Sequence, residues 1–399
     1  MDKPKRKVLV ITNIFPNNVE PHSGAFNLYQ FSALAEVIDL KVVAPVPWLL
    51  GTKIYATFKG FGRVGRVKFE ENLSGLKVFH PKFYNIWAMQ FLSGIIFFLS
   101  VFNTIRRISA SFKFNLIIAT WAYPDAFASL FIAKIFRVPF IVKVHGSDIL
   151  CVKNPLIVQM IKYMLKRADR IICVSQDLKS KIGTMGITDM SKVYVLYNGT
   201  DLNEFKPIEK EEVRTKVNLP CKKQIITYIG TLKTSKGVYI LLDAFLNLVH
   251  SVKNKNFHLI FLGEGPEKEK LRNKVKSYNL ESAIDFLGVK PHKEVPLFIN
   301  ASDVIILPSF SEGVPNAILE SLACGVPVVA TRVGGIPEIV NSDEVGILVP
   351  PADAMLLTSA LTSFFEKGWN RMKIRNHAKK FSWDNNIQIF SHIIESIIN

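Results

Sequence analysis

Two glutamates, Glu312 and Glu320, lie eight positions apart in the segment with the clearest chemical pattern of the chain. Apolar runs over 304–307 and 326–330 flank them, which predicts a strand, a polar loop with Glu312, a helix with Glu320 and a second strand. Backbone N–H groups and the helix dipole favour negative charge where a helix begins, so this loop suits a phosphate. Glu320, further inside the helix, is placed to accept hydrogen bonds from hydroxyls such as those of a ribose. Phosphate, ribose and sugar together indicate a nucleotide-sugar site.

The residues around the two glutamates make the pattern specific. Pro-Ser precedes Glu312, Glu-Gly-x-Pro-Asn contains it, and Ala-Cys-Gly-x-Pro-Val follows Glu320. The segment closely resembles the Glu-x7-Glu signature of glycosyltransferase family 4-like enzymes, a retaining family with the GT-B fold. The opening 13–26 resembles the bacterial cell-surface polysaccharide type in particular. The resemblance implies that Glu312 lies against the donor sugar and that Glu320 holds the ribose. It assigns the sugar hydroxyls and phosphate to Gly313, Val314, Pro315 and Asn316.

A lysine in the segment 230–237 is the candidate cation of the site. This Gly-Thr-Leu-Lys-Thr-Ser-Lys-Gly follows an apolar run. A cation there would neutralise a diphosphate leaving group as the sugar–phosphate bond breaks. Relatives usually have arginine after the first glycine and lysine before the last, whereas this chain keeps Lys236 but has Thr231 in the arginine's place. Either Lys233 reaches into the site or the site has one cation fewer, and a solvated surface position is the alternative for Lys233.

His145 and Gly24 extend the candidate site into the first half of the chain. His145, in His-Gly-Ser-Asp, directly follows the apolar run 140–144. The resemblance implies that it contacts outer hydroxyls of the donor sugar near the reaction centre, and a structural histidine in a turn capped by Asp148 is the alternative. Gly24 follows the first predicted strand and opens a helix, where the absence of a Cβ lets a diphosphate approach closely. The family has a glycine here that faces the donor phosphates, and a plain turn is the alternative.

Two further segments complete the donor site that the resemblance implies. Gly263 follows the predicted strand 258–262 and starts a tight turn beside the nucleotide. The segment ending at Val289 resembles the one whose backbone contacts the base, so the sequence does not identify the base. The motif Asn-Gly-Thr-Asp at 198–201 also matches the family, and we interpret it as a structural turn at the hinge.

The chemistry implied by these motifs does not require a metal. They contain no Asp-x-Asp of the metal-using kind and no His/Cys cluster, so we expect no metal and no cofactor, with lysine and helix-terminus charge in their place. The resemblance implies retention of the anomeric configuration through same-face attack, in which the departing phosphate takes the acceptor's proton. No side-chain nucleophile is then required, and Glu312 as a covalent nucleophile is the alternative.

Alternating apolar runs and helical patterns predict an α/β chain with two doubly wound Rossmann-like domains, the GT-B fold. An acceptor-binding domain is expected over 1–200, joined by a C-terminal helix over 382–399, and a donor-binding domain over 201–381. Such sheets place a cleft at the carboxyl ends of their strands. Strands are expected at 8–12, 41–44, 116–120, 140–144, 171–174, 193–196, 224–229, 258–262, 303–307, 326–330 and 346–349, with helices around 24–36, 125–136, 155–167 and 383–398.

Residues 83–105 carry no charge over a length that could span a bilayer. Their polar and apolar side chains separate onto two faces, which predicts an amphipathic helix. We interpret it as a core helix of the first domain, with a membrane-surface helix and a transmembrane span as alternatives. The polar face comprises Gln90, Ser93, Ser100 and Thr104, and the apolar face Trp87, Phe91, Ile95, Phe98 and Phe102.

The net charge of +17 is concentrated in residues 1–200, which carry +15 against +2 for the remainder. Such a surface suits anionic lipids, acidic glycans or nucleic acid, and no nucleic-acid motif accompanies it. We therefore expect an anionic membrane surface, and not nucleic acid, as a partner. Four cysteines without pairing or metal-ligand spacing indicate reduced thiols, and no signal-peptide pattern is visible. The expected location is cytoplasmic, peripheral on the inner face of the cell membrane.

These observations predict a retaining, hexosyltransferase-type glycosyltransferase in cell-surface glycan synthesis. It would move a sugar from a nucleotide-diphosphate sugar to a lipid-linked or polysaccharide acceptor. One alternative is a nucleotide-sugar epimerase on the same fold, which would act on the donor alone. The other is a non-catalytic sugar- or lipid-binding relative, for which Thr231 in place of arginine is the only hint.

Overall fold

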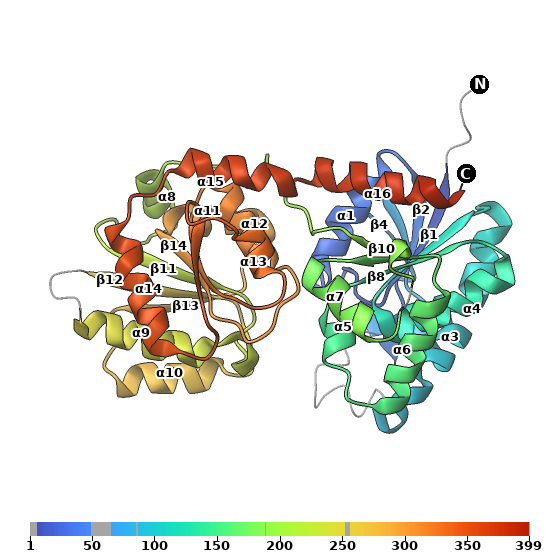
Figure 1. Ribbon diagram of the computed structural model, residues 1–399, viewed down its shortest axis with the longest axis horizontal. Helices are drawn as coiled ribbons and strands as arrows, with labels where there is room; N and C mark the ends of the chain where they lie inside the picture. Colours follow the sequence, from blue (N-terminus) through green and yellow to red (C-terminus); the bar gives the residue numbers. More distant parts are fainter. Residues whose placement is uncertain (1–5, 49–64, 85–86, 188, 252–255, 399) are drawn as a thin grey trace. The chain divides into compact units, whose positions relative to one another are not determined.

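The computed structural model describes residues 6–48, 65–84, 87–187, 189–251 and 256–398. The chain divides into two units, unit 1 with residues 1–198 and 386–399 and unit 2 with residues 199–385. The domain limits expected from the sequence were 200 and 382, close to these two crossing points. Each unit is described by itself, and Figure 1 labels the elements of both.

Unit 1 contains an eight-stranded sheet in the order β10-β9-β8-β7-β1-β2-β5-β4. All neighbouring strands are parallel except β4 and β5, which form an antiparallel hairpin at the edge. Strands β3 and β6 pair separately in parallel. The strands are β1 Lys7–Ile11, β2 Asp39–Val43, β3 Val46–Trp48, β4 Glu70–Leu73, β5 Leu76–Phe79, β6 Lys82–Tyr84, β7 Leu116–Thr120, β8 Phe140–Val144, β9 Arg170–Cys173 and β10 Val193–Val195.

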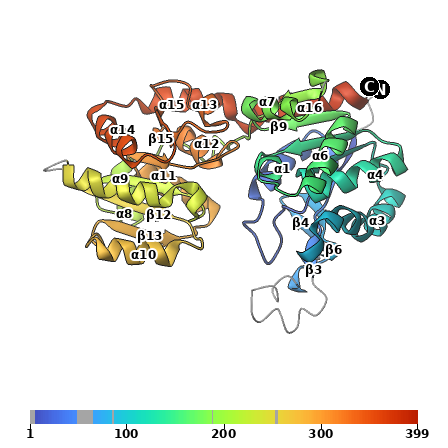
Figure 2. The ribbon, with the colours of Figure 1, turned by 60° about the horizontal axis from the view of Figure 1, so that its bottom comes forward.

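Helices cover the two faces of this sheet. Phe31 of α1 and Phe390 of α16 pack in one cluster with sheet residues such as Val10 and Ile118. Helices α3, α4 and α6 lie side by side elsewhere on the unit (Figures 1 and 2). The helices are α1 Ala25–Ala35, α3 Ser93–Ser111, α4 Phe127–Phe136, α5 Ser147–Leu150, α6 Pro155–Arg167, α7 Gln176–Thr184 and α16 Trp383–Ile398, with short turns at Trp87–Leu92, Ala122–Ala126 and Met190–Lys192.

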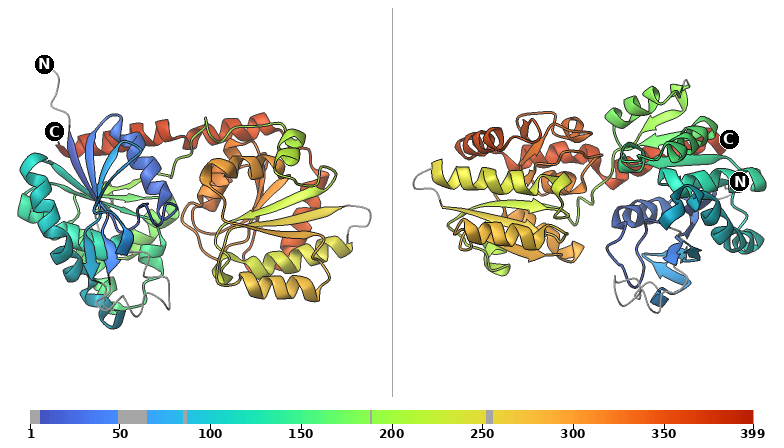
Figure 3. Two further views of the ribbon diagram at one scale, coloured as in Figure 1. Left: turned by 180° about the vertical axis from the view of Figure 1, so that it is seen from behind. Right: turned by 90° about the horizontal axis from the view of Figure 1, so that it is seen from below.

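Unit 2 contains a six-stranded parallel sheet in the order β13-β12-β11-β14-β15-β16. Figure 3 shows this sheet and the helices beside it from two further sides. Its strands are β11 Gln224–Ile229, β12 Phe257–Leu262, β13 Ile284–Gly288, β14 Val304–Leu307, β15 Val328–Thr331 and β16 Gly346–Val349. Its helices are α8 Lys210–Lys216, α9 Val238–Ser251, α10 Lys268–Ser277, α11 Val295–Ala301, α12 Asn316–Ala323, α13 Ile336–Ile339, α14 Ala354–Glu366 and α15 Arg371–Ala378, with short turns at Thr234–Lys236, His292–Glu294 and Lys379–Phe381. The strand order reverses direction between β11 and β14, and ligands bind at such switch points in open α/β sheets.

The expected helix over 83–105 is corrected by the structure. Phe83 belongs to β6, and the helix proper, α3, begins only at Ser93. Its buried side includes Ser93 and Thr104, whereas Ile95 is exposed. The predicted polar face therefore turns partly inward, because Phe97 and other large apolar residues share that side of the helix. The stretch Met89–Ser111 is long and apolar enough to cross a membrane by length and composition alone.

Candidate active site

The loops after β11 and β14 are joined at the switch point of unit 2. Gly237 adopts a left-handed conformation (φ 69°), and a Cβ there would lie 1.9 Å from the carbonyl oxygen of Pro308. The backbone N–H of Phe310 donates to the carbonyl of Ser235 at 3.0 Å. Only glycine permits this approach without displacing backbone atoms. The last glycine of the 230–237 motif therefore fixes the lysine-bearing loop against the glutamate-bearing loop.

Lys236 and Glu312 form an ion pair at this junction. Lys236 Nζ lies 2.6 Å from Glu312 Oε1, and their side chains are 30% and 10% exposed. Ser309 Oγ donates to the same carboxylate oxygen at 2.7 Å. A charge-assisted hydrogen bond at this distance is among the stronger polar contacts in proteins. The structure thus brings two of the predicted catalytic residues together.

A turn on the far side of the loop holds residues 313–316 in position. Gly334 has a left-handed backbone (φ 54°), and a Cβ there would lie 1.9 Å from the carbonyl of Glu312. The N–H of Gly335 donates to the carbonyl of Gly313 at 2.8 Å. The predicted run Gly313, Val314, Pro315 and Asn316 leads directly into α12, whose first residue is Asn316. Loop and helix start are therefore fixed by backbone contacts.

Glu320 lies further along α12 and contacts a histidine that the sequence motifs did not include. His292 Nε2 is 3.3 Å from Glu320 Oε1, and its Nδ1 is 3.5 Å from Glu204 Oε1. Phe205 packs against the imidazole edge-on at 5.1 Å. Burial lowers the pKa of His292, but hydrogen bonds and charge from Glu320 and Glu204 outweigh it, so this pKa lies above its ordinary value. His292 thus connects the predicted ribose ligand to the start of unit 2.

Three predicted donor-binding residues line one cavity in unit 2. Thr231, Gly263 and Val289 border a space of about 270 Å³ at the ends of β11, β12 and β13. A Cβ at Gly263 would lie 2.0 Å from the carbonyl of Gly230, so glycine is required where the two loops cross. This close contact alone requires a glycine at position 263, independently of the predicted nucleotide.

Lys233 has an exposed side chain, and it forms no ion pair with any residue that the structure describes. Its backbone N–H donates to the carbonyl of Thr231 at 2.9 Å. The hydroxyl of Tyr228, which no motif included, donates to the same carbonyl oxygen of Thr231 at 2.9 Å. Burial, with a smaller contribution from the charge of Glu312, raises the pKa of Tyr228 above its usual range. The threonine in the arginine's place is therefore held by a buried, protonated tyrosine.

His145 lies at the carboxyl end of β8 in unit 1, as its place after the strand predicts. Its ring packs between Phe26, with centroids 5.0 Å apart, and Trp121, at 6.1 Å and nearly parallel. Asp148 accepts hydrogen bonds from the backbone N–H groups of His145 and Gly146, so the turn has the aspartate cap that the alternative interpretation required. Burial and the charge of Lys143 hold the pKa of His145 well below its ordinary value, and the imidazole is neutral at pH 7.

Gly24 has a local structural role in unit 1. Its backbone is left-handed (φ 67°), and a Cβ there would lie 2.4 Å from the carbonyl oxygen of Ile14. Gly24 caps the start of α1 without a side-chain hydrogen bond. The turn alone, which was the alternative interpretation, therefore requires a glycine at this position, independently of a diphosphate.

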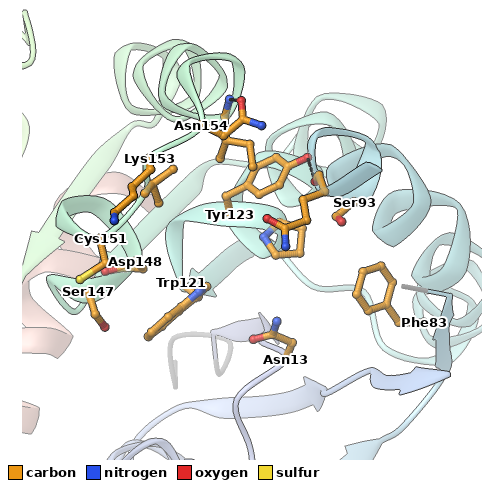
Figure 4. A pocket seen from close by; sticks show the side chains of 14 residues that line it. Asn13, Phe83, Ser93, Trp121, Tyr123, Ser147, Asp148, Cys151, Lys153 and Asn154 are labelled. Carbon is orange, nitrogen blue, oxygen red and sulfur yellow. Dashed lines mark hydrogen bonds between the residues drawn. The ribbon is translucent and has the colours of Figure 1, made fainter. Parts of the chain in front are cut away.

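A cavity of about 590 Å³ opens in unit 1 below the loop that follows β7 (Figure 4). Its walls combine aromatic rings, amides and hydroxyls with the amine of Lys153. Trp121 has φ 104°. A non-glycine residue in that region is strained and is typical of functional sites. The lining residues are Asn13, Phe83, Gln90, Ser93, Trp121, Tyr123, Pro124, Ser147, Asp148, Cys151, Val152, Lys153, Asn154 and Ile157.

Sequence comparisons assign both halves of the chain. Residues 209–381 match the family described as glycosyl transferases group 1, and residues 67–204 match Glycosyltransferase Family 4. Together the two ranges cover most of the chain. Each half of the chain matches a glycosyltransferase family, and this identifies the chain as a glycosyltransferase. This confirms the predicted fold and the general activity class.

Similar proteins extend over nearly the whole length of this glycosyltransferase. It is 27% identical over 372 residues to TuaC of Bacillus subtilis, named as a glycosyltransferase of teichuronic acid biosynthesis, covering 90% of this chain and 89% of that one. It is 29% identical to an uncharacterized glycosyltransferase of Methanocaldococcus jannaschii over 75% of this chain and 81% of the relative.

Solved structures show the same fold. Sucrose-phosphate synthase from Thermosynechococcus elongatus matches with a TM-score of 0.79 and 19% identity, covering 98% of this chain and 99% of that chain. HepE of Anabaena, solved in complex with UDP, matches with a TM-score of 0.72 and 18% identity, covering 98% and 100%. The fold of this glycosyltransferase is therefore shared along the full chain by proteins of low sequence identity.

Two residues of the site were missed from the sequence, and for different reasons. His292 stands alone between a proline and a lysine, so nothing in its neighbourhood marks it. Its sequence separation from Glu320 is too large for a local pattern to reveal the contact. Tyr228 lies inside an apolar strand, where an aromatic residue is expected for packing alone. A metal cluster of three or more His, Cys, Asp or Glu residues is absent from the described part of the chain.

Proposed function

We propose that this chain is a retaining glycosyltransferase that transfers a sugar from a nucleotide-diphosphate sugar to a glycan or lipid-linked acceptor in cell-surface polysaccharide synthesis. The observation that carries the proposal is the Lys236–Glu312 pair at the switch point of unit 2, on the loop that leads to Glu320. The names of relatives in teichuronic and colanic acid biosynthesis support the acceptor class. The structural neighbour solved with UDP and glucose supports the donor class.

Lys236 has the role of neutralising the diphosphate. Its ammonium is paired with Glu312 at 2.6 Å and remains 30% exposed. A phosphate that arrives at the start of α12 shares this ammonium, and the helix N-terminus adds favourable dipole charge. As the sugar–phosphate bond breaks, negative charge grows on the leaving group, so a fixed cation stabilises the transition state more than the ground state.

Glu312 orients the donor sugar rather than attacking it. Its Oε1 already accepts hydrogen bonds from Lys236 and Ser309, and the side chain is only 10% exposed. A carboxylate so held is a poor nucleophile but a firm acceptor for sugar hydroxyls. The attacking acceptor hydroxyl then approaches the anomeric carbon from the leaving-group side, and its proton passes to the departing phosphate oxygen. Atoms balance in this step without a protein nucleophile or a metal.

His145 is proposed to contact donor-sugar hydroxyls as a neutral imidazole. Its Nε2 is buried and has no hydrogen-bond partner among the described residues. An unpaired buried polar atom is costly, so a ligand hydroxyl at this nitrogen is favourable. Because its pKa is lowered, the ring stays neutral over the range in which the enzyme would operate.

The cavity of unit 1 is proposed to bind the acceptor. Aromatic rings such as Trp121 and Tyr123 provide flat apolar faces, while amide groups such as those of Asn13 and Asn154 provide hydrogen bonds (Figure 4). Carbohydrates present both kinds of surface.

A ligand screen followed by product analysis tests the proposal. The melting temperature of the purified chain is measured by differential scanning fluorimetry with UDP-, GDP-, ADP- and dTDP-sugars, with and without EDTA. One class of nucleotide sugar should raise it, because a ligand that binds only the folded state stabilises that state by mass action. Glu320→Gln should reduce that shift, and the matched surface variant Lys233→Ala should retain more of it.

The anomeric configuration and the alternatives are tested with the nucleotide sugar so identified. NMR of the product should show the donor's configuration retained. An inverted product would refute the retaining mechanism. Conversion of the donor without any acceptor into an epimeric sugar would establish an epimerase instead. No stabilisation by any nucleotide sugar would leave only the non-catalytic alternative.

A further inference from the structure

Helix α3 presents an apolar stripe to solvent. Ile95, Leu99 and Phe102 recur at the spacing that places side chains on one helix face, and the basic Arg106 follows them on that face. Leu99 is 65% exposed and Ile95 is 51% exposed, whereas the opposite face with Phe97 is fully buried against unit 1. The helix therefore packs on the unit with one apolar face and leaves a second apolar face uncovered.

The stripe continues across two neighbouring helices. Phe102 of α3 contacts Phe136 of α4 with ring centroids 6.3 Å apart. Phe131 of α4 stacks on Tyr163 of α6 at 6.4 Å and an interplanar angle of 14°. Ile135 of α4 is 54% exposed between these contacts. Figure 1 shows the three helices grouped together on unit 1. We refer to this outward side of α3, α4 and α6 as the α3–α4–α6 surface.

The charge of this surface has one sign. The three helices contain no aspartate or glutamate. Their basic residues form no ion pair with any residue that the structure describes; two of them lie over aromatic rings instead, Arg167 at 3.7 Å from the centroid of Tyr163 and Lys134 at 5.8 Å from that of Phe131. The basic residues are Arg106, Arg107, Lys134, Lys162, Lys166 and Arg167.

We propose that the α3–α4–α6 surface docks unit 1 on an anionic lipid bilayer. Exposed apolar side chains bordered by cations match the headgroup boundary, where acyl chains lie beneath phosphates. A second copy of the chain fits less well, because a twofold contact would bring like charges together. The buried face of α3 excludes insertion of this helix across the membrane without loss of the packing of Phe97, Val101 and Ile105.

This inference goes beyond the proposed transfer reaction and does not depend on it. An enzyme with a soluble acceptor has no need of such a surface, whereas one whose acceptor carries a lipid gains by remaining at the bilayer. Vesicle binding is measured without any substrate, so its failure and the failure of the proposed function are separate outcomes.

The test is sedimentation of the full chain with vesicles of phosphatidylcholine, alone or mixed with phosphatidylglycerol. Binding should require the anionic lipid and should weaken with added salt. Ile95→Ser with Leu99→Ser should reduce the bound fraction at low lipid by about tenfold. The matched control, Val37→Ser with Met372→Ser, removes two equally exposed apolar residues elsewhere and should bind as the unchanged chain does.

A second pair of variants separates local charge from total charge. Arg106→Ser with Arg107→Ser should weaken binding and flatten its salt dependence. Lys222→Ser with Lys276→Ser removes the same charge from exposed positions of unit 2 and should have little effect. Equal binding to neutral and anionic vesicles, or equal losses in both charge pairs, would overturn the proposal. A dimer in light scattering that Leu99→Ser dissociates, together with no vesicle binding, would establish an interface between copies instead.

Discussion

Units 1 and 2 share an architecture of parallel strands and covering helices, yet their polar residues are held in opposite ways. In unit 2 the predicted site consists of paired charges, with Lys236 on Glu312 and His292 between two glutamates. In unit 1 the charged groups near His145 are buried without an opposite charge. Lys143 is 1% exposed and donates only to amide oxygens, those of Gln30 at 2.6 Å and Asn198 at 3.3 Å.

The difference has a physical meaning for each site. Paired, partly exposed charges can exchange partners when a charged phosphate arrives. Buried, unpaired groups are displaced toward neutrality, because low dielectric disfavours the charged form. Burial lowers the pKa of Lys143 to about 7 and raises that of Asp148 to about 6. Unit 2 is therefore built for an ionic ligand, and the interior of unit 1 for neutral hydrogen bonding.

Substitution of Lys236 should have the largest effect on the paired charges of unit 2. Lys236→Ala should lower kcat by about a hundredfold or more, because removal of one preformed group that stabilises transition-state charge costs about 3 kcal/mol. Steady-state transfer kinetics with the donor found by screening measure it. Lys236→Arg should recover part of the activity, and Lys233→Ala should retain most of it. If Lys233→Ala proved as damaging, Lys233 would be the replacement for the arginine missing at Thr231.

Gly237 tests whether the unit 2 site depends on backbone contact. Gly237→Ala places a methyl group 1.9 Å from the Pro308 carbonyl, so the two loops must separate. Chemical denaturation should show unit 2 destabilised by about 2–4 kcal/mol. Gly75→Ala is the control, since Gly75 also has a left-handed backbone (φ 84°) but no atom within 4 Å of its Cβ position. Similar losses in both variants would show that backbone strain alone, without the contact, accounts for the effect.

The buried Lys143 should make the stability of unit 1, but not that of unit 2, depend on pH. Its pKa is about 7 when folded and near its ordinary 10.5 when unfolded. Between these values the unfolded chain binds more protons, so the stability of unit 1 should rise as pH increases from 7 toward 10. Hydrogen exchange of unit 1 peptides at several pH values measures this. Lys143→Met should abolish the rise while unit 2 peptides stay unchanged, and an identical pH dependence in both proteins would contradict the assignment.

His292 should give the smallest effect. Its folded pKa is raised, so its stabilising contribution is complete below pH 6.5 and is lost as pH increases through the folded value. His292→Gln should weaken nucleotide binding by about three- to tenfold, since a single partner of a carboxylate contributes about 1 kcal/mol. Calorimetric titration at pH 6 and pH 8 measures it. A wild-type affinity that does not fall between these pH values would separate His292 from the ribose site.

The sequence predicted the strands of both sheets well where they are buried on both faces. The runs Leu116–Thr120 and Phe140–Val144 are continuous apolar segments, and their limits agree with the structure. The hairpin of β4 and β5 was not predicted. Strand β4 lies at the sheet edge with Glu70 and Asn72 exposed, so it lacks an apolar run and follows its partner only through pairing.

The sequence likewise predicted some parts of the candidate site better than others. Residues of one motif, such as Glu312 and the 313–316 loop, stay together because they are neighbours in the chain. The ion pair with Lys236 joins residues far apart in sequence, and here the family resemblance supplied what local patterns cannot. Neither local patterns nor the resemblance revealed the role of His292, because it depends on a contact with the distant Glu320. Neither predicted which side of α3 is exposed, because that depends on which of its two apolar faces packs against unit 1.

The chain passes between the units after Asn198 and before Asn386, and both residues belong to the hydrogen-bond network around the buried amine of Lys143. Asn198 accepts from Lys143, while Asn386 accepts from Gln30 and donates to the Tyr197 carbonyl. The last helix also contributes Phe390 to the interior of unit 1. The interior of unit 1 is thus complete only once helix α16 has been synthesised and packed against it. The strands that are synthesised first therefore finish packing after unit 2 has been made, and removal of α16 should destabilise the sheet around β1 and β7.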